Sequence, residues 1–195
     1  MNIVDLSMNY VDIYSESLRG LLKLEKPSLR GLAQNLTNLK VLDLSMVNIS
    51  SSIPRVLSNI SSLTTLNLRR CSLYGEFPMN IFHLPKLQIL DAALNENLTD
   101  SLPEFQSRSR LKVLSILRTG FSGKLPDSIG RLESLSSLDL SQTSLSGTLP
   151  SSLGNLTRLT NLSLHDCKFS GQIPSSLANL SQLTTFGIGV NNFDA

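Results

Sequence analysis

The sequence predicts an α/β solenoid, a stack of similar units that each add one short strand to a parallel concave sheet. A leucine column recurs every 24 residues without drift, at Leu39, Leu63, Leu87, Leu111, Leu135, Leu159 and Leu183. Two more apolar columns follow each of these leucines, as Leu138 and Leu140 follow Leu135. Hydrophobic residues make up 41% of the chain and aromatic residues only 5%. We therefore expect a core of many similar leucine contacts.

The spacing inside each unit predicts the strand. In the pattern Leu-x-Leu both leucines point to one face, because side chains alternate along a strand. One such strand cannot bury its leucines alone, so neighbouring units must stack. The pattern LxxLxL at this period resembles the leucine-rich repeat, whose units span about 20–29 residues. The residues between the leucines then face outward on the concave side.

A second motif recurs in the later half of each unit. Gly-x-x-Pro stands at 75–78, 123–126, 147–150 and 171–174, and Ser-Ser-Ile-Pro at 51–54 keeps all but the glycine. The stretch LSGTLPSSLGNLTRLTNLSL (145–164) resembles the plant extracellular subclass with consensus LxGxIPxxLxxLxxLxxLxL. Residues 23–50 further resemble the N-terminal repeats of plant receptor-like proteins of the disease-resistance type. This resemblance implies a right-handed superhelix with a second short strand at xIP and 3₁₀ turns on the convex side.

The chain is expected to form a single solenoid over residues 1–195. Val4 and Leu6 match strand positions, but the next repeat begins only at Leu39. We therefore expect an irregular first repeat with an inserted loop at 10–38, then regular repeats over 39–195. Neither end carries the family's paired-cysteine cap, which favours a piece of a longer ectodomain or a truncated product. A signal peptide and a membrane-spanning run are expected to lie outside this chain.

The two cysteines are predicted to stay unpaired. Cys71 and Cys167 occupy the same slot of the unit, four repeats apart. At about 4.8 Å per stacked strand they lie roughly 19 Å apart, whereas a disulfide needs Cα atoms within about 7 Å. We expect two half-buried thiols. Most members of this family hold asparagine in that slot, where its amide joins neighbouring backbones, and Val47 is expected to weaken the resulting ladder.

Seven Asn-x-Ser/Thr sequons support passage through the secretory pathway. They stand at Asn35, Asn48, Asn59, Asn97, Asn155, Asn161 and Asn179. Three of them, Asn59, Asn155 and Asn179, repeat at one position on the turn side. Asn161 instead projects from the concave strand, where a glycan would cover part of a binding face. The alternative is that these triplets are simply favourable turn and strand sequence.

The concave columns are the candidate ligand-binding surface. Residues in one column of adjacent strands lie close enough to be read together. An acidic row runs beside an arginine cluster, whose planar groups suit carboxylates such as a peptide C-terminus or uronic acids. The candidate ligand-binding residues are Asp43, Asn67, Arg69, Arg70, Asp91, Arg118, Asp139, Gln142, His165 and Asp166.

Other kinds of site are not expected. Ser141, Ser163 and His165 invite comparison with a catalytic triad, but the pattern offers neither a strained nucleophile turn nor an enclosed pocket. No cofactor and no metal site are predicted, because His83 has no second ligand nearby and the acidic row is spaced by strands. The net charge of +2 makes nucleic acid an unfavoured partner.

The favoured function is recognition of a peptide, protein or oligosaccharide by the ectodomain of a plant receptor-like protein in defence or developmental signalling. Such a protein acts at the extracellular face of the plasma membrane and needs a co-receptor. Three alternatives stay open: the ectodomain of a receptor kinase, an inhibitor of fungal polygalacturonase, and a truncated remnant without activity.

Overall fold

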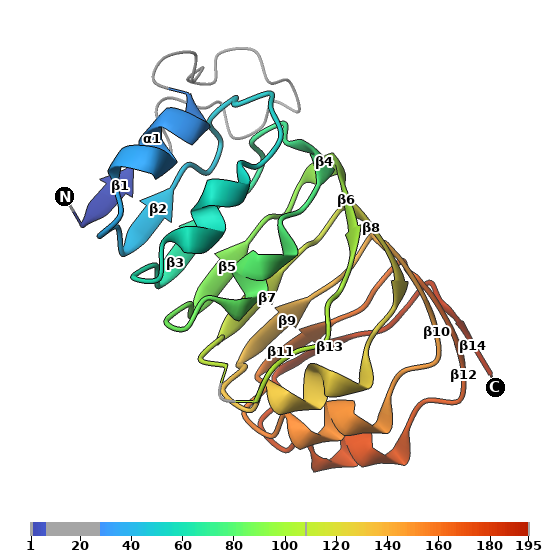
Figure 1. The fold of residues 1–195 in the computed structure, drawn as a ribbon. Helices are drawn as coiled ribbons and strands as arrows, with labels where there is room; N and C mark the ends of the chain where they lie inside the picture. Colours follow the sequence, from blue (N-terminus) through green and yellow to red (C-terminus); the bar gives the residue numbers. More distant parts are fainter. Residues whose placement is uncertain (1, 7–27, 108, 195) are drawn as a thin grey trace.

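Parallel strands stack into one continuous concave sheet in the computed structural model, which describes residues 2–6, 28–107 and 109–194 (Figure 1). Its eight strands follow the chain in order, and the central apolar residues of successive strands are paired, as Leu138 is with Leu162. The predicted solenoid is therefore confirmed. These strands are β1 (Ile3–Asp5), β2 (Val41–Asp43), β3 (Thr65–Asn67), β5 (Ile89–Asp91), β7 (Val113–Ser115), β9 (Ser137–Asp139), β11 (Asn161–Ser163) and β13 (Thr185–Gly187).

A second sheet runs along one side of the solenoid, where the Gly-x-x-Pro motif predicted it. It has six parallel strands: β4 (Tyr74–Glu76), β6 (Asn95–Ser101), β8 (Thr119–Lys124), β10 (Ser144–Gly147), β12 (Lys168–Gly171) and β14 (Asn192–Phe193). Gly123 and Gly147 have φ values of +85° and +81°, which a residue without a side chain adopts readily. The motif glycine therefore sets the path of the chain out of this sheet.

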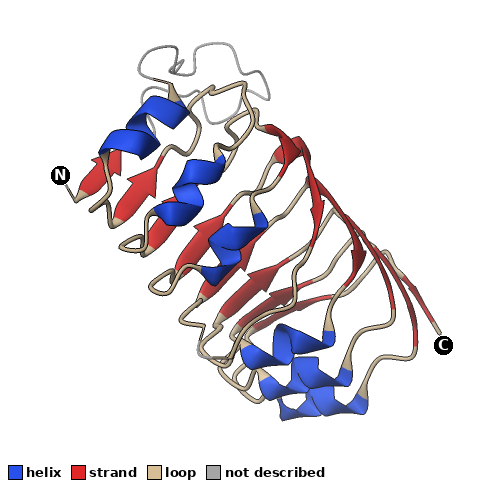
Figure 2. Ribbon diagram, viewed as in Figure 1, coloured by secondary structure: helices blue, strands red, loops and turns tan. Residues whose placement is uncertain are grey.

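Short helices line the convex side (Figure 2). Each 3₁₀ helix follows a proline whose φ is already fixed near the helical value. They are η1 (Arg55–Asn59), η2 (Met79–His83), η3 (Asp127–Arg131), η4 (Ser151–Asn155) and η5 (Ser175–Asn179). None of the helices within the described ranges is long and apolar enough to cross a membrane.

The expected loop at 10–38 is wrong in its last part. Residues 7–27 lie outside the described ranges, but Leu29–Asn35 form an α-helix, α1, which Ser28 caps by accepting a hydrogen bond from the N–H of Gly31. Leu29 and Ala33 are buried in the core. Their spacing of four residues puts both on one face of the helix, so this segment already serves as the convex side of a repeat.

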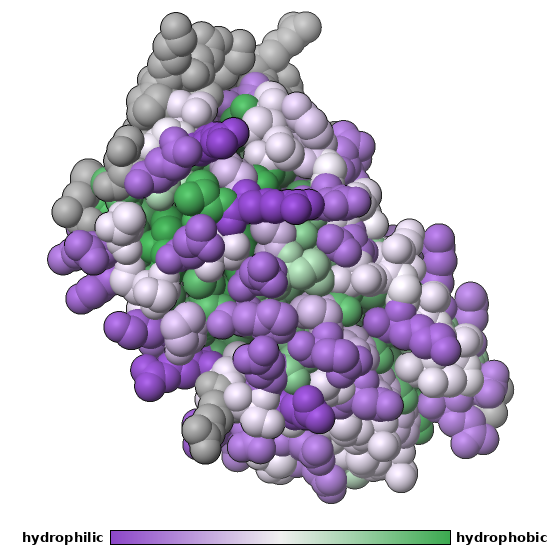
Figure 3. Space-filling view, in the orientation of Figure 1, coloured by the Kyte–Doolittle hydropathy of each residue, from purple (hydrophilic) through white to green (hydrophobic). Residues whose placement is uncertain are grey.

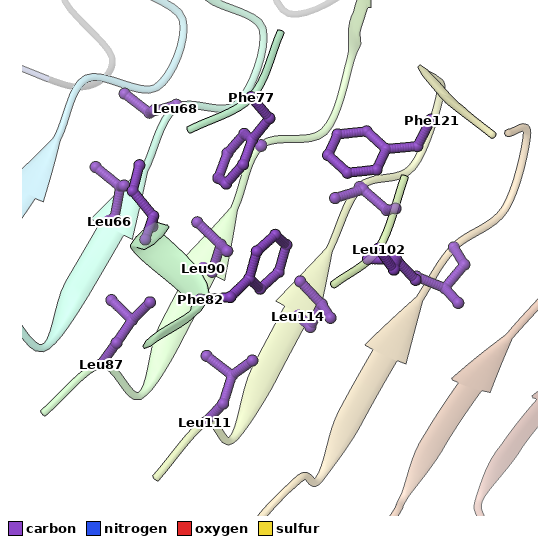
Figure 4. Packing of buried hydrophobic residues seen from close by; sticks show 14 of the residues in the cluster. Leu66, Leu68, Phe77, Phe82, Leu87, Leu90, Leu102, Leu111, Leu114 and Phe121 are labelled. Carbon is purple, nitrogen blue, oxygen red and sulfur yellow. The ribbon is translucent and has the colours of Figure 1, made fainter. Parts of the chain in front are cut away.

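The core is built from leucine layers with a cluster of phenylalanines at one level. Leu66, Leu90 and Leu114 are fully buried in successive strands. The ring of Phe77 lies 5.2 Å from that of Phe82, measured between centroids, and Figure 4 shows both rings facing the leucine rows. Such tilted pairs add about 0.5–1.5 kcal/mol beyond the burial of their area.

The asparagine slot ties adjacent repeats together. The side-chain amide of Asn95 donates to the carbonyl oxygens of Leu68 and Ala92 at 2.9 Å, and its oxygen accepts from the N–H of Cys71 at 3.0 Å. Thr143 keeps only the donor half, to the carbonyl of Leu140 at 2.8 Å. A buried amide satisfied on both sides holds three chain segments in place.

Both cysteines occupy this slot as free thiols, but they are buried rather than half-buried. The thiol of Cys71 donates to the carbonyl of Leu44 at 2.9 Å, and that of Cys167 to the carbonyl of Leu140 at 3.2 Å. The slot points into the stack, which explains the burial. Desolvation raises the pKa of Cys71 to about 12, so this thiol stays neutral at physiological pH.

The fourth repeat breaks the pattern. Strand β6 shifts register against β8 between Asn95 and Thr99, which absorbs one extra residue that this repeat has before Leu102. Where this repeat should carry a convex helix, residues 102–107 form none. Instead the next repeat supports the segment: Ser128 accepts from the N–H of Phe105 at 2.8 Å, and Arg131 donates to the Phe105 carbonyl at 3.1 Å.

Candidate functional site

The acidic row of the concave face, which includes Asp43, Asp91 and Asp139, stabilises the backbone where the strands end. Asp43, Asp91 and Asp139 each accept a hydrogen bond from the backbone N–H two residues onward, at 2.9, 2.9 and 3.1 Å. Asn67 does the same for the N–H of Arg69 and also donates to Asp43 at 2.9 Å. Such turns stabilise the exit from the strand. One oxygen of each carboxylate thus accepts from the backbone; the second oxygen of Asp43 accepts from Asn67, and the second oxygen of Asp91 lies 3.7 Å from Arg69.

The column that contains Arg70, Arg118, Gln142 and Asp166, three residues after the acidic row, does not lie flat on the concave face. Its members have positive φ values between 53° and 62°, at Met46, Arg70, Leu94, Arg118, Gln142, Asp166 and Val190. This left-handed conformation is uncommon for residues with side chains and costs about 1 kcal/mol or more each. The chain therefore turns sharply here, from the concave sheet toward the second sheet.

That turn creates a rim pocket between the two sheets. Its volume is about 400 Å³, and it is lined by Arg70, Ser72, Leu73, Leu94, Asn95, Glu96, Asn97 and Arg118. The structure thus brings Arg70 and Arg118 together at one pocket. Arg69 lies apart from them, on the concave face, where its guanidinium is 3.7 Å from the carboxylate of Asp91.

Arg69 and Arg118 each have an acidic neighbour. Glu96, which the sequence analysis did not single out, pairs with Arg118 at 2.9 Å between Oε1 and Nε. Both side chains are more than half exposed, so the pair contributes little to stability and remains open to exchange with a ligand. Burial raises the pKa of Asp91, although the N–H of Ala93 and the charge of Arg69 oppose the shift. The side chain of Asp91 is only 21% exposed, so this part of the face is partly shielded from water.

Sequence reasoning also missed an outward column that lies two residues before the acidic row. It consists of Val41, Thr65, Ile89, Val113, Ser137, Asn161 and Thr185. Its N-terminal members are mostly apolar, and Ile89 is 37% exposed. The same period of 24 residues contained this signal, since each member stands two residues after a repeat leucine. Beside Arg69 and Asp91 it makes a surface that is apolar and charged at once, which is typical of recognition sites.

The C-terminal half of the concave face is polar and built from small side chains. The hydroxyls of Ser141 and Ser163 lie 2.6 Å apart, and Asp139 is engaged by its own turn. His165 is exposed, and within the described residues its imidazole makes no hydrogen bond. Gln142 and Asp166 are exposed on the same side. The structure thus brings two serines together but leaves the histidine out of the pair.

Among the residues that the structure describes, no three His, Cys, Asp or Glu side chains gather as metal ligands. A ring nitrogen of His83 lies 3.3 Å from the carbonyl oxygen of Glu104. This side chain therefore links two repeats.

The sequons fall on three different surfaces. Asn59, Asn155 and Asn179 are exposed at the last residue of η1, η4 and η5. Asn97 is exposed on the second sheet. Asn161 is half-buried on the concave strand β11, where its amide donates to Ser137 at 3.1 Å. A glycan on the first three would therefore leave the concave face clear.

A solenoid of stacked leucine-rich units with one concave parallel sheet defines a leucine-rich-repeat protein. In agreement, the Leucine Rich Repeat family model matches residues 38–60, 62–84, 134–156 and 158–180. Receptor-like protein 6 of Arabidopsis thaliana is 44% identical over 140 residues, which cover 71% of this chain and 14% of that protein. Receptor-like protein Cf-9 of Solanum pimpinellifolium is 41% identical over 107 residues, 53% of this chain and 12% of that protein.

Solved structures agree with this assignment. The complex of PEPR1 with AtPEP1 superposes with a TM-score of 0.77 at 30% identity, over 80% of this chain and 22% of that one. The plant peptide hormone receptor RGFR1 in complex with RGF2 gives a TM-score of 0.77 at 28% identity, over 80% and 25%. The chain belongs to the leucine-rich-repeat family, in its plant extracellular, receptor-like class. It spans about 14% of the length of Receptor-like protein 6.

Proposed function

We propose that this chain is the ligand-recognition part of a plant receptor-like protein and binds a peptide or protein on the concave face of β3, β5 and β7. The observation that carries the proposal is the surface formed by Ile89, Arg69 and Asp91 beside the rim pocket with Arg70 and Arg118. Apolar and charged groups within one face suit an extended peptide, whose side chains and terminal carboxylate differ in chemistry.

The relatives support the same proposal. PEPR1 and RGFR1 are named in complex with AtPEP1 and RGF2, and HAESA of Arabidopsis is described in complex with the peptide hormone IDA and the co-receptor SERK1. By analogy this chain would act outside the cell, as part of a longer receptor, with a co-receptor and without enzymatic activity of its own. A polysaccharide ligand has less support than a peptide.

The experiment is peptide selection on the chain secreted from plant cells with an added signal peptide. A displayed library of random peptides is the probe, and the enriched peptides are then titrated against variants. Arg69→Ala combined with Arg118→Ala is expected to weaken binding by about tenfold or more, because arginines dominate many interfaces. The matched control is Arg158→Ala, an exposed arginine on the convex side. Equal affinity for all variants would remove the concave arginines from the proposal, and the absence of enrichment would contradict peptide binding.

A receptor-kinase ectodomain is the second candidate, since the solved neighbours include the receptor kinase HAESA. The full-length transcript decides between the two. A kinase sequence after a membrane-spanning helix would establish the receptor kinase, and a short cytoplasmic tail would establish the receptor-like protein.

A further inference from the structure

Asn97 occupies a different environment from the sequons on the convex turns. It lies in β6, and the next residue of its sequon, Leu98, is fully buried. Because side chains alternate along a strand, Asn97 and Thr99 both point outward, and both are exposed. The amide is therefore presented from a rigid strand rather than from a turn.

An aromatic ring lies directly beside this amide. Tyr74 of β4 is the register partner of Asn97 in the parallel pair, so both side chains leave the same face of the sheet, about 4.8 Å apart at the backbone. Tyr74 is 50% exposed. Within the described residues its ring stacks on no other aromatic ring and its hydroxyl makes no hydrogen bond. One face of the ring is thus available.

The other side of Asn97 is open. In the register between β6 and β8, Asn95 pairs with Thr119 and Thr99 pairs with Gly120, so residues 96–98 have no partner in β8. Gly120 of β8 approaches the backbone of Glu96 and Leu98, but Asn97 itself is exposed. It borders the rim pocket of about 400 Å³, together with Glu96 and Arg118. A sugar attached to this amide has space on one side and an apolar surface on the other.

We propose that Asn97 carries an N-linked glycan whose first sugar packs against the ring of Tyr74, at the mouth of the rim pocket. The apolar face of a pyranose ring suits an aromatic surface, and the Tyr hydroxyl remains in water. The donor is an oligosaccharide linked to a lipid pyrophosphate. Its C1–O bond to phosphate breaks, the Asn97 Nδ2–C1 bond forms, the lipid pyrophosphate leaves, and the amide proton passes to the transferase or water. The inference depends on passage through the secretory pathway, as the proposed function does.

The test uses the full chain secreted from plant cells, with glycopeptide mass spectrometry at each sequon. We expect Asn97 to be occupied. Under native conditions an endoglycosidase should release the Asn97 glycan roughly threefold or more slowly than the glycan of Asn155, because a stacked sugar is shielded for most of the time. Tyr74→Ala should abolish the difference, and Tyr74→Phe, which keeps the ring, should preserve it.

Each outcome supports or overturns a stated part of the inference. An empty Asn97 beside an occupied Asn155 overturns the site, and equal release rates in the unaltered chain overturn the packing even if a variant folds poorly. A difference that survives Tyr74→Ala overturns the role of the ring. Peptide binding is measured separately, so its loss would contradict the proposed function and leave this inference standing.

Discussion

The N-terminal and C-terminal repeats share one strand pattern but differ on the convex side. In the C-terminal repeats η3, η4 and η5 stack closely, whereas α1, η1 and η2 stand apart (Figure 1). The close stack depends on two glycines: a Cβ on Gly130 would lie 2.5 Å from the backbone oxygen of Ser152, and one on Gly154 would lie 2.4 Å from that of Ser176. No side chain fits at such distances.

The corresponding position of η2 holds Phe82, which needs space. Its ring centroid lies 5.2 Å from that of Phe77 and 5.7 Å from that of Phe105. A groove of about 590 Å³ opens between η1 and η2, lined in part by Phe77. Hydrophobic residues are visible on this part of the helical side, within a mostly hydrophilic surface (Figure 3). Backbone hydrogen bonds set the spacing of the strands everywhere, so side-chain size on the convex side decides how far apart the repeats lie there.

The largest effect is expected where the N-terminal repeats rely on aromatic packing. Phe82→Ala should lower the free energy of unfolding by about 3–5 kcal/mol, since it leaves a cavity beside Phe77 and Phe105. Urea unfolding followed by circular dichroism measures it. Phe186→Ala is the control, because that ring is 49% exposed and its loss should cost much less. Equal losses of stability in the two variants would mean that the aromatic cluster does not stabilise the N-terminal repeats.

Equal effects are expected where the two halves are alike. Leu66→Ala in β3 and Leu138→Ala in β9 should each lower the free energy of unfolding by about 2–5 kcal/mol, because both leucines are fully buried in the sheet. The same urea titration compares them. A difference above about 2 kcal/mol between the two variants would show that the strand layers are not equivalent.

A smaller effect is expected where the C-terminal repeats rely on close stacking. Gly154→Ala should lower the free energy of unfolding by about 1–3 kcal/mol, because the new methyl group meets the backbone of the next repeat. Thermal and urea unfolding both measure this loss. At the corresponding place in η1, Ser58→Ala should change stability by only about 0.5 kcal/mol. A stabilised Gly154→Ala would contradict the account of the stack.

The smallest effect is expected at the two cysteines, which occupy the same position of the repeat, one in each half of the solenoid. In the native protein at about pH 8, Cys71 should react with iodoacetamide at least tenfold more slowly than in the unfolded chain, since its pKa is raised to about 12 and the thiolate is the reactive form. Cys167, which is 9% exposed where Cys71 is 0%, should react first. Peptide mass mapping after timed labelling gives both rates. Faster labelling of Cys71 would show that the N-terminal stack opens more readily than its burial implies.

Much of the fold follows from local pattern. The leucine period predicted every strand of the concave sheet from β2 onward, and the Gly-x-x-Pro motif, through the family resemblance, predicted the second sheet. Helix α1 was missed because Leu29 and Ala33 stand before the first regular leucine, where no repeat aligned them. The candidate columns were found by counting, but counting could not show that Asp43 and Asp139 close their own turns.

The sequence by itself determined the repeat, the buried leucine layers and the slot shared by Asn95, Cys71 and Cys167, because alternation along a strand depends only on neighbours in the chain. Only the tertiary structure decided that Arg118 meets Glu96 at a rim pocket and that Tyr74 stands beside Asn97. These contacts depend on a residue in the left-handed conformation after each concave strand from β2 to β13 and on a register shift in β6, which arise from the stacking of distant segments.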